Sequence, residues 1–210
     1  MSFSSKVKEE LSRQSSTARH CQIAELAAVL SFCGRVQISE NDHYRIKIHT
    51  ENAAVARKCF TLLKKTFNIG TDVSVRRNAF LKKTLTYTVA VQNHQDALRV
   101  LRAAKILQED GEIGETLSLA DNVILQRSCC RRSFIRGAFL AAGSISDPEK
   151  FYHLEIVCPT AEKASQIQTV IGTFGIDAKM VVRKKYFVVY VKEGSQIVDL
   201  LNVMEAPVSL

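Results

Sequence analysis

The sequence repeats itself. Residues 20–33 form an apolar run of helical length that stops at Gly34, and Arg131 to Ala142 form a second such run that stops at Gly143. The two glycines stand 109 residues apart (143 − 34). Glycine often ends a helix because it accepts a left-handed backbone conformation. A repeat with this offset in a chain of 210 residues indicates two related units of similar size.

The same order of elements is predicted in both units. In the first, the apolar patterns predict helices at 20–33, 52–68 and 94–108 and strands at 35–38, 44–49, 72–75 and 84–91. In the second, they predict helices that end at 142 and span 160–174 and 194–203, with strands after Gly143 and at 151–157, 178–183 and 185–192. Each unit is therefore α-β-β-α-β-β-α, and two such units can bury their first helices against each other.

The first helix of each unit carries small residues at three- and four-residue spacing. Small side chains let two helix backbones approach closely. We therefore expect these helices to pack on each other, with their other faces covering the two sheets. The residues expected at this contact are Ala24, Ala27, Ala28, Ser31 and Gly34 in the first unit and Gly137, Ala138, Ala141, Ala142 and Gly143 in the second. The alternative is ordinary alanine-rich helix without such a partner.

The charge is unevenly divided along the chain. Residues 1–108 hold 18 Lys and Arg against 8 Asp and Glu, a net charge of +10, while residues 109–210 hold 11 against 13, a net charge of −2. A basic half attracts a polyanion such as DNA, although a basic surface can also simply keep a protein soluble. Residues 109–121 contain five acids, two glycines and no base, which is typical of a linker. The predicted organisation is an N-terminal helical extension at 1–19, a first half at 20–108, an acidic linker at 109–126 and a second half at 127–210.

Two nine-residue segments carry a family resemblance. Leu26-Ala27-Ala28-Val29-Leu30-Ser31-Phe32-Cys33-Gly34 and Ile135-Arg136-Gly137-Ala138-Phe139-Leu140-Ala141-Ala142-Gly143 resemble the LAGLIDADG helices of homing endonucleases. Together with the segments 1–11 and 131–139, they make the whole chain resemble the WhiA family of bacterial regulators of sporulation and cell division. The resemblance implies an α+β LAGLIDADG fold with a pseudo-two-fold axis, two four-stranded antiparallel sheets and a central helix pair. It also implies a C-terminal helix-turn-helix domain, which we expect to be absent because the chain ends at Leu210.

The resemblance raises the question of DNA cleavage. LAGLIDADG enzymes hold a divalent metal through a carboxylate that precedes the terminal glycine of each helix. Here these positions are Cys33 and Ala142, and neither side chain supplies an oxygen ligand. A displaced site built from Glu25 and Asp147 would need both residues to bend back toward the glycines. We therefore expect no catalytic residues and no enzymatic activity, with an active endonuclease that uses displaced acids as an alternative.

The resemblance places the outer faces of both sheets along DNA, and basic residues occur where those faces and their hairpin turns should be. Arg45 and Lys47 alternate with Ile46 and Ile48 in a strand with one buried face. The expected DNA-contacting residues are Arg45, Lys47, Arg76, Arg77, Lys82, Lys83, Arg183, Lys184 and Lys185. Such contacts hold phosphates and carry little base specificity. The alternative is that exposed lysines and arginines simply occupy turns and protect edge strands from pairing.

The six cysteines, at 21, 33, 59, 129, 130 and 158, predict neither a metal site nor disulfides. No C-x-x-C spacing occurs, and the adjacent Cys129 and Cys130 are expected to point apart on a helix. The five histidines are scattered through the sequence. The first residues do not show the apolar core and cleavage pattern of a signal peptide, and the sequence contains no apolar run of membrane length, so we expect a cytoplasmic, nucleoid-associated protein with reduced thiols.

The resemblance, together with the missing acids, implies a catalytically inactive LAGLIDADG-like scaffold of a DNA-binding transcriptional regulator in sporulation, cell division and chromosome segregation. Its expected partners are double-stranded DNA, contacted mostly at the phosphates, and a regulatory protein. We expect no cofactor, no membrane and no small-molecule substrate. The alternative is a protein-interaction scaffold that does not bind DNA.

Overall fold

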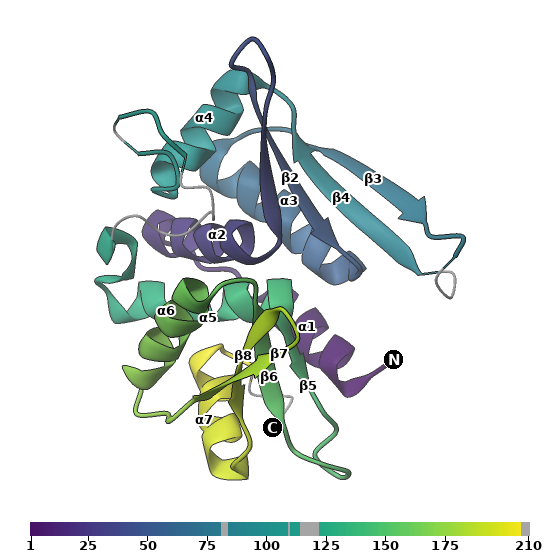
Figure 1. Cartoon of the computed structure of the whole chain (residues 1–210), viewed down its shortest axis with the longest axis vertical. Coiled ribbons are helices and arrows are strands. Elements are labelled where there is room, and N and C mark those ends of the chain that lie inside the picture. The colour runs from purple at the N-terminus through teal and green to yellow at the C-terminus, as the bar shows by residue number, and fades with distance from the viewer. Residues whose placement is uncertain (81–83, 109, 114–121, 207–210) are drawn as a thin grey trace.

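The computed structural model describes residues 1–80, 84–108, 110–113 and 122–206 (Figure 1). Lys82, Lys83 and most of the predicted acidic linker lie outside these residues. The described chain forms two α+β halves, one above the other in Figure 1, which meet through the helices α2 and α5. The predicted fold class is confirmed.

The first half contains a four-stranded antiparallel sheet with the strand order β1-β2-β4-β3. Ile46, Ile48, Val89 and Val91 are buried on the face of this sheet that the helices cover. Its elements are α2 (Arg19–Cys33), β1 (Gly34–Ile38), β2 (Tyr44–Thr50), α3 (Ala53–Phe67), β3 (Asp72–Arg77), β4 (Leu85–Val91) and α4 (His94–Ala103).

The second half repeats this arrangement, with a four-stranded antiparallel sheet of order β5-β6-β8-β7. A short 3₁₀ helix, η1 (Asn122–Leu125), precedes it. Its elements are α5 (Ser128–Ala142), β5 (Gly143–Ile145), β6 (Leu154–Cys158), α6 (Ala161–Gly172), β7 (Lys179–Arg183), β8 (Tyr186–Val191) and α7 (Gly194–Val203). Both halves therefore have the predicted order α-β-β-α-β-β-α.

The helices α2 and α5 lie in backbone contact at Gly137. A Cβ atom added to Gly137 would lie 2.4 Å from the carbonyl oxygen of Glu25 and 3.0 Å from the Cβ of Ala28. Of the small residues expected at this contact, Ala24, Ala27, Ala28 and Ala138 are fully buried, Ser31 is buried, and Ala141 and Ala142 are half-buried. Because only a residue without a side chain fits there, Gly137 sets how closely the two halves approach.

Gly34 and Gly143 end their helices for a different reason from the one expected. Their φ angles are −93° and −89°, so both are extended and the predicted left-handed conformation is wrong. In each half the strand begins at this glycine, directly after the last residue of the helix. A Cβ atom would then lie 2.7 Å from the carbonyl oxygen of Leu30 at Gly34, and 2.2 Å from Cδ2 of Phe139 at Gly143. Glycine is required at both positions because a side chain would clash with the preceding helical turn, and not because of the backbone conformation.

The N-terminal extension forms α1 (Phe3–Arg13), which begins with the side chain of Ser2 accepting a hydrogen bond from the N–H of Ser5. Its apolar side chains Val7 and Leu11 are fully buried in the common core, and α1 lies against α3 and α5. The N–H of Ile145 in β5 donates to the Ser4 hydroxyl at 3.3 Å. The extension therefore contacts both halves.

The helices end near their predicted positions, except for α4. The pattern predicts a helix to 108, but α4 ends at Ala103. The chain reverses there because Lys105 adopts a left-handed φ of 58° and the N–H of Ile106 donates to the carbonyl of Leu101. None of the described helices is both long and apolar enough to cross a membrane.

Candidate nucleic-acid interface

Strand alternation places four cations on the outer face of the first sheet. Lys47 of β2 pairs directly with Arg35 of β1, and Arg45 lies two residues before it on the same face. Lys47 also pairs with Ala90 of β4, and Thr86 lies on the same face of β4 as Ala90. Arg76 of the edge strand β3 pairs with Thr86, so Arg76 shares this face with Lys47. We call Arg35, Arg45, Lys47 and Arg76 the first-sheet cations.

Among the residues that the structure describes, no acid neutralises the first-sheet cations. Within the described part of the chain, none of the four makes an ion pair. His49 lies beside them and donates or accepts a hydrogen bond with the Thr88 hydroxyl at 3.0 Å. Burial lowers the pKa of His49, and the charges of Arg35 and Lys47 lower it further. Asp72 is an acid on the same face, on the edge strand. This face therefore has a positive potential available to a phosphate backbone.

Arg76 and Arg77 do not share a face, although they were expected to act together. Arg77 pairs with Leu85, on the side of the sheet that carries Val73 and Val75. Both arginines are exposed because the β3–β4 hairpin extends past the helices (Figure 1). Arg76 therefore belongs with Arg45 and Lys47, and Arg77 belongs to the opposite face. Lys82 and Lys83, in the same hairpin, lie outside the described residues.

On the outer face of the second sheet, the cation Arg183 is paired with an acid. Arg183 of β7 donates to both carboxylate oxygens of Glu155 in β6, at 3.0 and 2.8 Å. His153 lies 3.1 Å from the same carboxylate, and its ring stacks on Tyr190. The hydrogen bond from Arg183 is the main reason why the pKa of Glu155 is lowered; burial opposes this, and His153 adds to it. Arg183 is therefore engaged with an acid rather than available to a phosphate.

The other cations of the second sheet differ in whether an acid already pairs with them. Lys179 of β7 is paired with Asp177 at 2.7 Å. Lys184 and Lys185 form the exposed β7–β8 turn, where Lys184 has a left-handed φ of 55° and Lys185 lies over the ring of Tyr186. The two turn lysines remain candidates for contacts with flanking phosphates, but they do not extend the outer face.

The ends of α2 and α5 carry Cys33 and Ala142. Cys33 and Ala142, which occupy the positions expected for metal-binding acids, are both half-buried. Burial raises the pKa of the Cys33 thiol to about 12, so at neutral pH it is uncharged, and the nearby charge of Lys8 offsets only part of this effect. Lys8 also lies over the ring of Phe139 in the last turn of α5. A neutral thiol beside an ammonium group is a poor site for a divalent cation.

The alternative acid, Glu25, is committed elsewhere. Its fully buried carboxylate accepts hydrogen bonds from Arg136 at 3.1 and 3.2 Å and lies 3.4 Å from Nζ of Lys58. Burial is the largest single influence on the pKa of Arg136 and lowers it, but Glu25 and Glu205 together outweigh burial and the pKa is raised. Asp147 instead accepts the N–H of Glu149 in a turn after β5. Glu25 therefore joins the two halves through a buried ion pair and cannot reach DNA.

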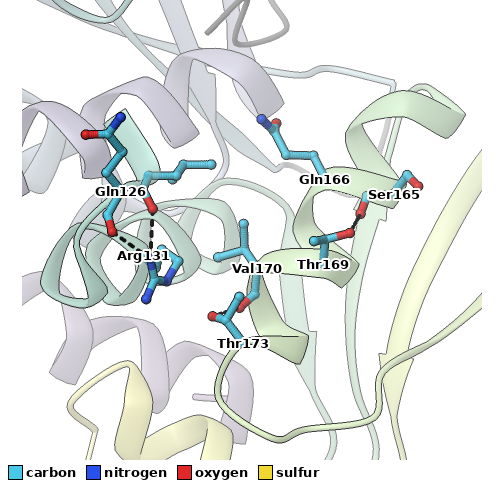
Figure 2. A pocket seen from close by; sticks show the side chains of 8 residues that line it. Gln126, Arg131, Ser165, Gln166, Thr169, Val170 and Thr173 are labelled. Atoms are coloured by element: carbon cyan, nitrogen blue, oxygen red, sulfur yellow. Dashed lines mark hydrogen bonds between the residues drawn. The ribbon is translucent and has the colours of Figure 1, made fainter. Parts of the chain in front are cut away.

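A cavity of about 470 Å³ lies between η1, the start of α5 and α6. Figure 2 shows Arg131 beside it, with its guanidinium donating to the carbonyl oxygens of Leu125 and Gln126. On the opposite wall the Thr169 hydroxyl donates to the carbonyl of Ser165. The lining is largely uncharged, and its one cation already holds the chain before α5. These side chains have a structural role in the second half.

Comparison with known proteins assigns the chain to a family. The WhiA N-terminal LAGLIDADG-like domain matches residues 19–107, and the WhiA LAGLIDADG-like domain matches residues 131–210. The chain belongs to the WhiA family. A WhiA relative from Lachnoclostridium phytofermentans, named "Probable cell division protein WhiA", is 53% identical over 210 residues, which is 100% of this chain and 67% of the relative. A relative of the same name from Alkaliphilus oremlandii is 44% identical over 98% of this chain and 65% of its own length. The chain thus spans about two thirds of these WhiA proteins.

Solved structures support the WhiA fold. Full-length DUF199/WhiA from Thermatoga maritima matches with a TM-score of 0.71 at 21% identity, over 98% of this chain and 62% of that chain. The homing endonuclease I-WcaI, solved bound to its DNA recognition sequence, matches with a TM-score of 0.60 at 12% identity, over 97% of this chain and 91% of that one. At these identities the likeness establishes that this WhiA-family chain shares the LAGLIDADG fold.

One cluster of side chains in this WhiA-family chain was missed from the sequence. His20 and Cys21 at the start of α2 meet Cys129 and Cys130 at the start of α5, so the expectation that the adjacent cysteines point apart is wrong. Burial, together with the neighbouring sulfur atoms of Cys21 and Cys129, raises the pKa of Cys130 to about 12. The signal was present in the repeat, because the offset of 109 residues that relates Gly34 to Gly143 also relates 20 and 21 to 129 and 130.

Proposed function

We propose that this chain is a DNA-binding scaffold without nuclease activity, within a transcriptional regulator of cell division, sporulation and chromosome segregation. Curated relatives that span its whole length are named probable cell division proteins, and a homing endonuclease of the same fold was solved with DNA bound. DNA binding would place the chain at the nucleoid.

The observation that carries the proposal is the asymmetry between the two outer faces. The first-sheet cations have no acidic partners among the described residues, whereas Arg183 and Lys179 of the second sheet are paired with Glu155 and Asp177. Cations without partners can exchange bound counterions for phosphates, and the entropy of counterion release then favours binding. The first half therefore supplies most of the affinity, and it reads little sequence because its contacts are to the backbone.

The residues at the ends of α2 and α5 support the proposed absence of cleavage. Cys33 and Ala142 bring no negative charge to the place where a divalent ion would be needed, and Lys8 brings a positive one. Glu25 is fully buried in its ion pair. Incubation of supercoiled and linear duplex with the protein and Mg²⁺ or Mn²⁺ should leave every strand intact. A cut that disappears in an E25Q or D147N variant would overturn this part of the proposal.

DNA binding is tested by fluorescence anisotropy with a labelled duplex of arbitrary sequence at low salt. The R45E/K47E variant reverses two first-sheet cations. Each lost phosphate contact should weaken binding by about tenfold at 0.1 M salt, so the double variant should bind about a hundredfold more weakly. Unaltered affinity of R45E/K47E would show that this face does not contact DNA.

Adjacent arginines provide a matched control. R76E and R77E change the same charge on neighbouring residues of one exposed strand, but only Arg76 shares a face with Lys47. R76E should weaken binding by at least about tenfold, whereas R77E should remain within about threefold of the unmodified protein. Equal losses would indicate an unspecific charge effect rather than a bound face.

A protein-interaction scaffold is the second candidate function. It is favoured by exposed apolar side chains on the β3–β4 hairpin, where Val73, Val75 and Leu85 lie on the face opposite the first-sheet cations. No binding of duplex DNA even at low salt would favour this candidate over the DNA-binding scaffold. The regulatory protein that such a surface would bind is part of this proposal.

A further inference from the structure

The first turns of α2 and α5 bring four metal-binding side chains together. The ligand atoms of His20, Cys21, Cys129 and Cys130 all lie within 4.8 Å of one another. We call these residues the histidine–cysteine cluster. Each helix supplies its second and third residues, so the cluster follows the pseudo-two-fold axis that relates the two halves. Half of the donors come from each unit of the repeat.

The distances fit tetrahedral coordination. Zinc–sulfur bonds of about 2.3 Å and zinc–nitrogen bonds of about 2.0 Å place a sulfur and a nitrogen on one tetrahedron about 3.5 Å apart. In the structure, Nδ1 of His20 lies 3.1 Å from the sulfur of Cys130, 3.4 Å from that of Cys21 and 3.9 Å from that of Cys129. Shifts of a few tenths of an ångström, chiefly in the exposed side chains of His20 and Cys129, would equalise these distances. Three thiolates and one imidazole form a donor set typical of structural zinc sites.

The surroundings of the cluster favour a site with net negative charge. Zinc with three thiolates and a neutral imidazole carries a charge of −1. The positive ends of two helix dipoles meet here, and neither α2 nor α5 has a side-chain N-cap. Cys21 and Cys130 are buried, while His20 and Cys129 are exposed, so an ion can enter from solvent.

Arg127 must move for the ion to bind. Its guanidinium now lies 3.1 Å from Nε2 of His20 and can only donate to it. Coordination through Nδ1 leaves the imidazole proton on Nε2, so this hydrogen bond would be lost. Arg127 is exposed, and it can swing aside without uncovering any buried group. Its positive charge would still lie near an anionic zinc site.

We propose that His20, Cys21, Cys129 and Cys130 bind one Zn²⁺ ion that joins the N-terminal ends of α2 and α5. The ion has a structural role, because all four tetrahedral positions are filled by protein and none is left for water or substrate. It would fasten the two halves at the ends of these helices opposite to Gly34 and Gly143. A helix of 15 residues is about 22 Å long, so the ion would lie about one helix length from Gly34, where β1 begins, and we expect it to act on stability.

The test uses the full chain, purified with a phosphine reductant from cells supplied with zinc. Metal analysis should find about one zinc ion per chain. Replacing the zinc with Co²⁺ should give the strong visible absorption of tetrahedral cobalt and a thiolate-to-cobalt charge-transfer band. A strong chelator should lower the melting temperature of the protein, because the folded state binds the ion and the unfolded chain binds it less well.

Variants locate the ion and distinguish it from adventitious binding. C129S/C130S should lose the zinc and the cobalt spectrum, while C33S, which changes a cysteine at the other end of α2, should keep both. H20Q changes an exposed residue, so it should remain folded while its cobalt spectrum shifts. The proposal is wrong if reduced protein contains no zinc and gives no charge-transfer band with Co²⁺, or if C129S/C130S retains the metal of the unmodified protein. A disulfide between Cys21 and Cys129 or Cys130 that persists in reductant would also overturn it.

Discussion

Replacing Gly137 by alanine tests the contact between the two halves. In an exposed helix this change would stabilise the protein by about 1 kcal/mol, because alanine has the higher helix propensity. Here the new Cβ would lie 2.4 Å from the carbonyl oxygen of Glu25, a backbone atom that cannot rotate away. The helices would have to separate by about 1 Å, and overpacking of this kind typically costs about 1 to 3 kcal/mol or more. We expect a net loss of about 2 kcal/mol.

The assay is thermal unfolding followed by circular dichroism. For a chain of this size, a loss of about 2 kcal/mol lowers the melting temperature by about 4 to 8 °C. Gly172 provides the control, because a Cβ added at the end of α6 meets no atom within 4 Å. G172A should leave the melting temperature unchanged or raise it slightly. The reasoning is refuted if G137A is as stable as G172A, since α2 and α5 would then not be in the close contact described here.

Two further changes probe ion pairs of different burial and pH dependence. E25Q leaves the buried Lys58 without its acid and leaves Arg136 paired only with the exposed Glu205, and it should cost about 3 to 5 kcal/mol. E9Q removes an exposed pair with Arg13 and Arg57 and should cost less than about 1 kcal/mol; urea titrations of both variants measure the difference. The pKa of Glu155 is lowered from its ordinary value of 4.5, so its contribution to stability is present above that pH and is lost as the pH falls. Between about pH 7 and pH 3, the melting temperature of E155Q should therefore fall less steeply than that of the unmodified protein. Parallel curves would show that the pairing with Arg183 contributes nothing to stability.

Much of the fold could be predicted from the sequence because local patterns repeat. The alternation of Arg45 and Lys47 with Ile46 and Ile48 indicated a strand with one outer basic face, and the structure has that strand at Tyr44–Thr50. The early end of α4 could not be predicted, because it depends on the left-handed conformation of Lys105, a residue with no special preference for it. The small residues at α2 and α5 indicated a helix contact, but only the structure singles out Gly137 as the point of backbone contact.

The candidate interface was less predictable because it depends on strand order. Arg183 is in β7 and Glu155 is in β6, with β8 between them, so their pairing requires the arrangement β6-β8-β7. The separation of Arg76 from Arg77 follows from simple alternation and could have been predicted once the strand was known to extend to residue 77. The histidine–cysteine cluster could have been predicted by applying the repeat offset of 109 residues to the first turns of the two helices as well as to their ends.

The central claim is that the first sheet, and not the second, contacts the phosphates of DNA. Its most direct test is the slope of the logarithm of the binding constant against the logarithm of salt concentration for two double variants. R45Q/K47Q removes two cations that pair with no described acid, and K179Q/R183Q removes two that are paired with acids. We expect the slope to fall in magnitude by about 2 for R45Q/K47Q and not to change for K179Q/R183Q. An equal fall for both variants, or a fall only for K179Q/R183Q, would contradict it.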